Sequence, residues 1–295
     1  MEVLKKNSVG LKGVCVVLGF FDGIHAGHVE VLSSAVKYAK DKNVKTVLLT
    51  FSSAPAEYFN RDFTYIYPRE ISYELISNIG IDYIVEKEFS SLAQISAEKY
   101  LKSLVEEYSP VAIFSGFNHT FGLNRVGNPE YLDLNSKKYG YEYFSIPACK
   151  FNDEQVSSTL IKKYLAEGFV EYANKMLTSP FLIESIVVEG MKLGRKLGFP
   201  TANMKYPIGI VKLPYGVYKV EVFNKLAILN WGIKPTINND CEEVLEVHIP
   251  NFNSDLYGKT LRIKVLQKIR DEKKFSSIDE LKEQISKDVE TCLKL

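Results

Sequence analysis

Apolar residues follow two different spacings in the first half of the chain. Short apolar runs typical of buried strands occur at residues 14–18, 44–51, 81–85, 111–114 and 141–148. Stretches with helical spacing occur at residues 29–40, 67–79, 96–108 and 157–167. Because strands and helices alternate, the pattern predicts a doubly wound, mostly parallel α/β sheet, in which ligands bind beyond the carboxyl ends of the strands.

The alternation stops after the last of these helices, and the second half is rich in short strands. They are expected at residues 181–188, 216–223, 225–230, 244–249 and 261–266. A final amphipathic helix is expected to begin at Ser277 or Asp279 and to end near Cys292. This pattern predicts a small antiparallel β-barrel with a C-terminal helix. We therefore expect two domains, residues 1–178 and 179–295.

The composition narrows the class of partner. Apolar residues make up 46% of the 295 residues and the formal net charge is +1, which gives no support to a broad nucleic-acid or membrane surface. The sequence shows no signal peptide and no apolar run long enough to span a bilayer. Its four cysteines are far apart and form no C-x-x-C pair, as expected of reduced thiols. We expect a cytoplasmic protein that binds small molecules, and the sequence leaves its oligomeric state open.

The stretch from Gly19 to His28 joins an expected strand to an expected helix. Its glycines, which include Gly23 and Gly27, permit positive φ and a close approach of a ligand to the backbone. The free N–H groups of the helix start form an anion site. His25 and His28 can donate hydrogen bonds to phosphate and carry positive charge near neutral pH. A phosphate site is favoured over a purely structural turn, and over a metal site because no Cys/His cluster supplies further ligands.

Two other segments follow expected strands of the same sheet. Asn118, in the segment 115–122, could hydrogen-bond a ribose or a phosphate, although the segment alone is more typical of a turn. Ser158 and Thr159 lie at a helix start, where hydroxyl groups cap free N–H groups or bind phosphate oxygens. Lys162 follows one turn later on the same side. These segments could meet the Gly19–His28 loop in one crevice, and the alternative for the second is an ordinary capped helix.

A glycine-rich stretch marks the second half. Gly190, Gly194 and Gly198 suit a loop that wraps phosphates. Thr201 and Asn203 are two residues apart, so both can face one side of an extended segment. Hydroxyl and amide oxygens can ligate a Mg²⁺ ion that bridges nucleotide phosphates.

The expected strand at residues 244–249 alternates between polar and apolar residues. Glu246 and His248 share one face, and Leu245, Val247 and Ile249 share the other. Taken alone, Glu246 is more typical of an exposed carboxylate on a half-buried strand.

These motifs resemble those of one enzyme family. Residues 19–28 resemble G-x-F-D-G-x-H-x-G-H, the nucleotide-binding signature of the bacterial FAD synthetases, which are HxGH nucleotidyltransferases. Residues 115–122 and 156–162 resemble the family segments G-[FE]-[DN]-[FH]-x-F-G and I-S-S-T-x-I-R. Residues 190–203 match the riboflavin kinase signature G-x-x-x-G-R-x-L-G-F-P-T-A-N, and residues 245–249 resemble its E-x-H strand. Over nearly its whole length the chain resembles the prokaryotic bifunctional riboflavin kinase/FAD synthetases.

The resemblance implies two reactions and a set of residue roles. The C-terminal domain would phosphorylate riboflavin to FMN with ATP, and the N-terminal domain would adenylylate FMN to FAD and release pyrophosphate. Catalytic roles fall to His25, His28 and Glu246, with Glu246 as general base, while Thr201 and Asn203 would hold Mg²⁺-ATP. The other binding residues implied are Gly19, Phe20, Asp22, Gly23, Gly27, Asn118, Ser158, Thr159, Lys162, Gly190, Gly194, Arg195, Gly198 and Pro200.

Five residues depart from the family pattern. Lys162 stands where Arg is usual, and lysine cannot form the planar fork of a guanidinium. His119 and Thr120 replace a common Phe-Arg pair, and Ser185 and Glu189 replace the usual Gly and His. These departures suggest the alternative that only one of the two activities is retained. A flavin- or nucleotide-binding regulator is the alternative from a different class.

Overall fold

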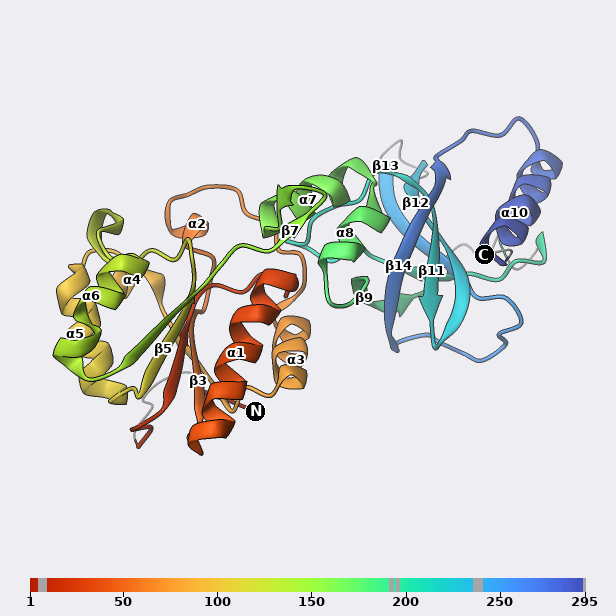
Figure 1. Ribbon diagram of the computed structural model, residues 1–295. Coiled ribbons are helices and arrows are strands. Elements are labelled where there is room, and N and C mark those ends of the chain that lie inside the picture. Colours follow the sequence, from red (N-terminus) through yellow and green to blue (C-terminus); the bar gives the residue numbers. More distant parts are fainter. Residues whose placement is uncertain (5–9, 191–193, 195–196, 236–240, 294–295) are drawn as a thin grey trace. The chain divides into compact units, whose positions relative to one another are not determined.

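The computed structural model describes residues 1–4, 10–190, 194, 197–235 and 241–293. The chain divides into two compact units, Met1–Ser158 and Thr159–Leu295, and each is described by itself (Figure 1). No helix in the described ranges is long and apolar enough to cross a bilayer. Among the cysteines whose side chains the structure describes, Cys15 and Cys292 are buried free thiols and Cys149 is a half-buried one. Burial raises the pKa of Cys15 to about 12.

The first unit is built on a six-stranded parallel sheet in the order β1-β4-β3-β2-β5-β6. Its strands are β1 (Glu2–Leu4), β2 (Cys15–Leu18), β3 (Thr46–Phe51), β4 (Tyr83–Lys87), β5 (Ala112–Gly116) and β6 (Glu142–Ile146). From β2 the chain first builds outward through β3 and β4, and then returns to build β5 and β6 on the other side. This reversal confirms the predicted doubly wound sheet and puts the topological switch point between β2 and β5.

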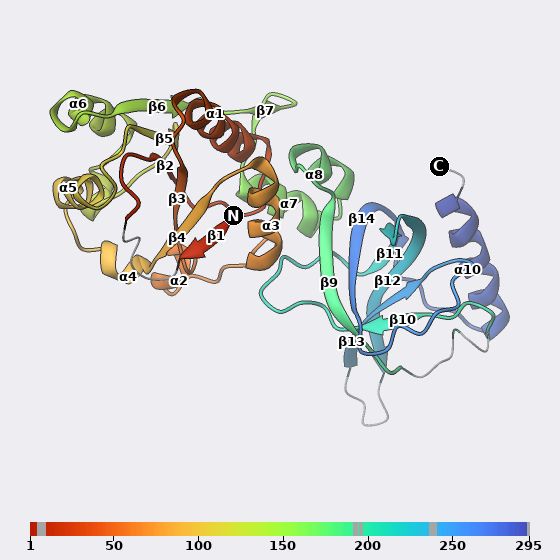
Figure 2. The ribbon, with the colours of Figure 1, turned by 90° about the horizontal axis from the view of Figure 1, so that it is seen from below.

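Helices cover both faces of the sheet (Figures 1 and 2). Those of the first unit are α1 (Ala26–Lys42), α2 (Pro55–Tyr58), α3 (Arg69–Ile79), α4 (Phe89–Leu92), α5 (Ala97–Tyr108), the 3-10 turn η1 (Leu123–Arg125) and α6 (Pro129–Tyr139). Strand side chains alternate, so Cys15 and Val17 pack with α1 and α3, while Val16 and Leu18 pack with α5 and α6. The core of the unit therefore consists of two apolar layers, one on each face of the sheet. Because the strands are parallel, their carboxyl ends lie together at one edge of the sheet.

The second unit contains the predicted closed antiparallel barrel, in the order β10-β13-β12-β11-β14-β9. Its strands are β9 (Phe181–Val188), β10 (Ala202–Met204), β11 (Gly216–Val222), β12 (Lys225–Pro235), β13 (Cys241–His248) and β14 (Thr260–Asp271). Helices α7 (Ser158–Glu167) and α8 (Val170–Met176) precede the barrel, and α10 (Ile278–Leu293) follows it. Figure 2 shows α10 along the side of the barrel, where Cys292 packs on Val217 and Ile228.

The barrel interior is filled by large side chains. Trp231 is fully buried, and its Nε1–H donates to the carbonyl of Leu213 at 3.0 Å. The ring of Tyr206 lies 4.6 Å from it, centroid to centroid. On α8, Asn174 donates to the carbonyl of Val265 and accepts the N–H of Phe181, both at 2.8 Å. The barrel interior is therefore filled by side chains.

Candidate active sites

One glycine and two hydrogen bonds hold the loop between β2 and α1 in one conformation. Gly23 has φ of +87°, and a Cβ there would lie 2.5 Å from Ile66 Cδ1, so only glycine fits. Asp22 is buried, and its Oδ1 accepts the N–H of Ile66 at 2.8 Å. The hydroxyl of Ser158 donates to the carbonyl of Asp22 at 2.7 Å. A residue from the end of the unit therefore lies against the opening loop, as expected from the motifs.

His25 and His28 form a stacked pair at the start of α1. His25 caps the helix, because its Nδ1 accepts the N–H of His28 at 3.3 Å. The two ring centroids are 3.6 Å apart, and the ring of Phe21 meets His28 edge-on at 4.8 Å. Since Nδ1 of His25 accepts a hydrogen bond, the proton of the neutral ring lies on Nε2 and can be donated. Nδ1 of His28 is buried and has no hydrogen-bond partner in the described parts of the chain.

Burial makes this pair neutral near pH 7. Desolvation lowers the pKa of His25 to about 4. Desolvation, and then repulsion from His25, lower the pKa of His28 well below its ordinary value. The positive charge expected from the sequence is therefore absent at neutral pH without a ligand. A bound polyphosphate would raise both pKa values, because a nearby negative charge favours the protonated ring.

We expect the first unit to lose stability as the pH falls from 6.5 toward 4. In the unfolded chain the pKa of His25 returns to about 6.5, whereas it is about 4 in the folded unit. Below pH 6.5 the unfolded state thus binds a proton that the folded state does not, and the stability present above pH 6.5 is progressively lost. His25 alone would account for about 3 kcal/mol over this interval.

Urea unfolding between pH 6.5 and 5, above the range where most carboxylates titrate, measures this effect. His25→Gln should show a shallower loss of unfolding free energy than the natural chain. Equal slopes for the two proteins would contradict the prediction. His119 contributes to the remaining slope, because burial also lowers its pKa to about 4.

The loop after β5 lies beside the opening loop. Ser115 is in register with Leu18, so both loops leave adjacent strands at the same edge of the sheet. Asn118 and Thr120 are exposed in this loop. His119 stacks on Phe121 with centroids 5.8 Å apart, and its Nε2 is buried without a hydrogen-bond partner among the described residues. Asn118, Ser158 and the histidine pair thus belong to neighbouring segments, while Thr159 is exposed and Lys162 half-buried on α7.

The sequence analysis missed a group of aromatic residues at this edge. The rings of Phe51, Tyr58, Phe59 and Phe89 meet at centroid distances of 5.1 to 5.8 Å, next to the carboxyl ends of β3 and β4. Tyr58 and Phe59 are 40% and 54% exposed. Phe20 makes a further contact with Phe63, at 6.1 Å. Exposed rings at the ligand-binding edge suit a planar aromatic ligand. The density of Phe and Tyr between residues 51 and 65 was the available signal.

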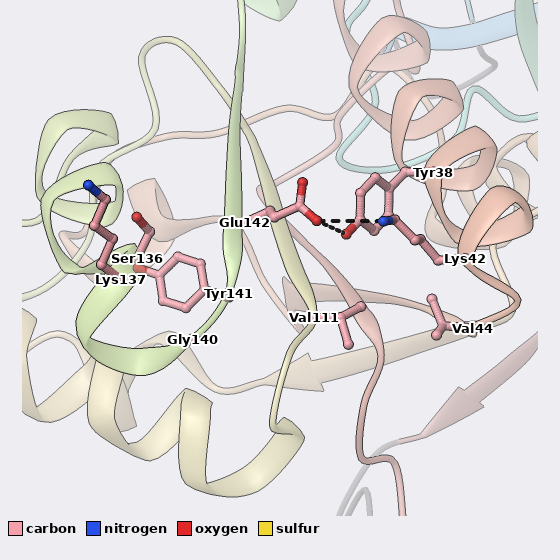
Figure 3. Close-up of a pocket in the computed structure, with 9 residues that line it drawn as sticks. All are labelled: Tyr38, Lys42, Val44, Val111, Ser136, Lys137, Gly140, Tyr141 and Glu142. Atoms are coloured by element: carbon pink, nitrogen blue, oxygen red, sulfur yellow. Dashed lines mark hydrogen bonds and ion pairs between the residues drawn. The ribbon is translucent and has the colours of Figure 1, made fainter.

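A hollow at the other edge of the sheet has different chemistry (Figure 3). Its volume is about 530 Å³, and Val44 and Val111, which line it, precede β3 and β5. Tyr38 donates to Glu142 at 2.7 Å, and Lys42 lies 3.9 Å from the same carboxylate. The C-terminal ends of α1 and α6 lie at this hollow. Their partial negative charge disfavours the binding of an anion there. An anionic ligand is therefore better accommodated at the carboxyl ends of the strands than in this hollow.

On the barrel, three polar residues lie side by side on neighbouring strands. Asn203 of β10 is directly opposite Glu246 of β13, and Glu246 is directly opposite Asn230 of β12. Glu246 is half-buried. Leu245, Val247 and Ile249 are buried inside the barrel, which confirms the predicted alternation. Direct cross-strand partners have Cβ atoms about 5 Å apart, so the row Asn203–Glu246–Asn230 can engage one ligand.

The glycine-rich stretch packs onto this row. A Cβ on Gly190 would lie 2.4 Å from Cγ of Asn203, and one on Gly194 would lie 2.4 Å from the carbonyl oxygen of Phe199. The turn at Gly198 has φ of +89°. Nδ1 of His248 lies 2.8 Å from the carbonyl oxygen of Pro200, within hydrogen-bond distance. This contact fixes the backbone just after the turn. Glycine at positions 190 and 194 thus lets the loop approach Asn203 and Thr201.

Several residues singled out in the sequence add little further geometry. Arg195 lies outside the described residues, as do residues 191–193 and 196. Thr201 is half-buried next to β10. Ser185 is half-buried in β9 opposite Leu261, and Glu189 is exposed just after that strand.

The two units together define a class of protein. A doubly wound sheet with a helix N-terminus at its switch point is typical of domains that bind nucleotides or phosphates. The barrel adds glycines of a second glycine-rich segment, Gly190 and Gly194, beside a row that contains the carboxylate of Glu246. This combination is the one expected of an enzyme that transfers phosphoryl or nucleotidyl groups, with one candidate site in each unit.

Comparison with known proteins identifies the family. A family model described as FAD synthetase matches residues 8–160, and one described as riboflavin kinase matches residues 177–295. A bifunctional riboflavin kinase/FMN adenylyltransferase from Buchnera aphidicola is 38% identical over 95% of this chain and 93% of its own length. The protein with the same description from Haemophilus influenzae is 34% identical over 96% and 94%. The chain belongs to the family of bifunctional riboflavin kinase/FMN adenylyltransferases.

A solved structure shares the fold over nearly the whole chain. It is a crystal structure described as a macrolide-efflux protein from Streptococcus pneumoniae, with a TM-score of 0.86 and 30% identity. The match covers 96% of this chain and 95% of that one.

Proposed function

We propose that this chain makes FAD from riboflavin in two steps, one in each domain. Residues 179–295 transfer the γ-phosphoryl group of ATP to riboflavin, and residues 1–178 transfer the adenylyl group of a second ATP to the FMN formed. The observation that supports this division is that one chain contains both kinds of site. The barrel has the row Asn203–Glu246–Asn230 beside the glycine-rich segment, and the parallel-sheet domain has the histidine-capped helix α1. Because ATP is the co-substrate of both steps, we propose that the protein acts in the cytoplasm.

Glu246 serves as general base in the kinase step. It accepts the proton of the terminal hydroxyl of riboflavin as the oxygen attacks the γ-phosphorus. Its neighbours Asn203 and Asn230 bracket the carboxylate and restrict its position.

Thr201 and Asn203 hold the nucleotide phosphates and would ligate Mg²⁺. Their side-chain oxygens are uncharged metal ligands. Within the described ranges, no group of three or more His, Cys, Asp or Glu side chains is placed to hold a metal ion. When bound, Mg²⁺ would neutralise charge on the phosphates. Gly190, which leaves room for the Asn203 side chain, and Gly194, Arg195, Gly198 and Pro200 would contact the ATP phosphates.

In the adenylylation step the FMN phosphate attacks the α-phosphorus of ATP and pyrophosphate leaves. The phosphate is already nucleophilic, so the protein has to align the reactants and stabilise charge on the reacting oxygens. His25, His28 and the N-terminus of α1 supply hydrogen-bond donors for this. The other phosphate and ribose contacts come from Asn118, Ser158, Thr159 and Lys162, and the loop with Gly19, Asp22, Gly23 and Gly27 gives the phosphates access to the backbone.

The aromatic group at the same edge binds the isoalloxazine ring of FMN. Its exposed members Tyr58 and Phe59 offer π-faces to a planar ring. Phe20, from the opening loop, belongs to the neighbouring contact with Phe63.

Incubation of the chain with riboflavin, ATP and Mg²⁺, followed by chromatography of the flavins, tests the proposal. We expect FMN to appear first and FAD to follow, and both to depend on Mg²⁺. Accumulation of FMN alone, or formation of FAD only from added FMN, would show that one activity is absent. Flavin binding without any turnover would instead support the regulator alternative.

A further inference from the structure

The hollow at the amino-terminal edge of the parallel sheet takes no part in the proposed reactions. It lies between the last turns of α1 and α6 and has a volume of about 530 Å³. Its apolar lining consists of Val44, Val111 and the ring of Tyr141. The hydroxyl of Tyr141 donates to the carbonyl of Leu132 at 2.6 Å, so the ring alone is available to a ligand. A hollow of this size, with an apolar lining and a few polar groups, suits a small organic molecule.

One carboxylate lies in the middle of the hollow. Figure 3 shows Glu142 with Ser136 and Lys137 of α6 on one side, and Tyr38 and Lys42 of α1 on the other. Its Oε1 accepts the hydroxyl of Tyr38 at 2.7 Å, whereas Nζ of Lys42 lies 3.9 Å away, beyond hydrogen-bond distance. Its Oε2 accepts no hydrogen bond from the described residues. The side chain is 57% exposed, so Oε2 can accept from a ligand.

The donors that remain in the hollow are ammonium groups. The lining residues outside the helices all bond through their N–H groups to carbonyl groups of the chain, at 2.8 to 3.2 Å: Val44, Val111, Gly140, Tyr141 and Glu142. The hydroxyl of Ser136 donates to the carbonyl of Asp133 at 2.6 Å. Lys42 is 56% exposed and its contact with Glu142 is loose, so its Nζ can turn to a ligand. Lys137 is a second exposed lysine at the hollow.

Neither a simple anion nor a simple cation matches these charges. An anion would meet Glu142 and the partial negative charge at the ends of two helices. A cation would meet Lys42 and Lys137. A ligand that carries both charges close together matches the hollow, because the carboxylate of Glu142 and Nζ of Lys42 lie 3.9 Å apart.

We propose that the hollow binds the zwitterion of an aromatic amino acid. In an α-amino acid the ammonium and the carboxylate are attached to one carbon, so they can engage Glu142 and Lys42 together. The ammonium donates to Oε2 of Glu142, and the carboxylate accepts from Nζ of Lys42. The side chain packs on Val44, Val111 and the ring of Tyr141, since aromatic pairs contribute beyond the area that they bury. Binding here requires neither flavin nor ATP.

Isothermal titration of the full-length chain with three probes tests the need for both charges. Phenylalanine carries both, 3-phenylpropionate has no ammonium, and phenethylammonium has no carboxylate. We expect phenylalanine to bind about tenfold more tightly than either of the others, as for one additional charge-assisted hydrogen bond. Equal affinities for the three probes, or no binding of phenylalanine up to about 10 mM, would overturn the proposal.

Two substitutions locate the binding. Glu142→Gln and Lys42→Gln should each weaken phenylalanine binding about tenfold. Glu142→Gln should not weaken 3-phenylpropionate, and Lys42→Gln should not weaken phenethylammonium, because each of these probes lacks the partner of the group removed. Unchanged affinity for phenylalanine in either variant would overturn the assignment.

A matched control comes from the same helix. Lys40 is exposed in the last turn of α1 and does not line the hollow. Lys40→Gln should therefore leave the affinity for phenylalanine unchanged, and a loss equal to that of Lys42→Gln would show that only the overall charge matters, which contradicts the proposal. Glutamine at position 142 can still accept the hydroxyl of Tyr38, so we expect the fold to be kept. Unfolding midpoints in urea close to that of the natural chain check this.

Discussion

Replacing Glu246 by glutamine is expected to lower the kcat of riboflavin phosphorylation by about 10²- to 10⁴-fold. Glutamine keeps the size of the side chain and can still form hydrogen bonds with its cross-strand partners, but it cannot take a proton. The KM values for riboflavin and ATP should change little, because only an interaction made in the transition state is lost. Steady-state rates of FMN formation, with FMN adenylylation measured on the same sample, check this.

Glu243 provides the matched control for that substitution. It lies three residues earlier on β13, where its carboxylate accepts hydrogen bonds from Lys212 and Tyr215, each at 2.7 Å. Glu243→Gln should retain nearly full kinase activity, because this carboxylate belongs to the opposite face of the strand. Equal losses for the two substitutions, or a parallel loss of FMN adenylylation in Glu246→Gln, would refute a specific role for Glu246.

Much of the fold could be predicted from the local spacing of apolar residues along the chain. The helices and strands that were not predicted show where this spacing is not informative. Strand β9 was predicted with the bounds that the structure has, because the segment Phe181–Val188 is rich in apolar and β-branched residues and contains no Gly, Pro, Asn or Asp. Helix α6 was missed because Leu132 is its only buried residue, which leaves almost no apolar period to detect. Strand β10 has three residues next to a Gly/Pro-rich loop and exists through its partners on β9 and β13.

The chemistry of the sites depends more on tertiary contacts. The motifs identified Asn203 and Glu246 separately, but only the register of β10 against β13 makes them direct neighbours. The histidines were expected to carry charge, and their burial against Phe21 and each other reverses this at neutral pH. The roles of all the candidate site residues, Thr159 and Lys162 among them, stay predictions.

His28→Ala is expected to lower the rate of FMN adenylylation by about 10²- to 10³-fold and to spare riboflavin phosphorylation. The substitution removes an imidazole that is neutral in the free protein and that gains a proton, or donates one in a hydrogen bond, when the charged phosphates arrive. Conversion of added FMN and ATP to FAD measures the first activity, and conversion of riboflavin to FMN the second. Comparable losses of both would refute the assignment of His28 to the N-terminal site alone.

Two further substitutions separate chemistry from packing at this position. His28→Phe keeps a ring against Phe21 and His25, whereas His28→Gln keeps a hydrogen-bonding group and loses the ring. If His28 stabilises charge on the phosphates, glutamine should retain more adenylylation activity than phenylalanine. If the ring only supports the loop, the order should be reversed, because phenylalanine would preserve the stacked contacts. The order of the two activities therefore decides between a phosphate-binding donor and a structural ring at the start of α1.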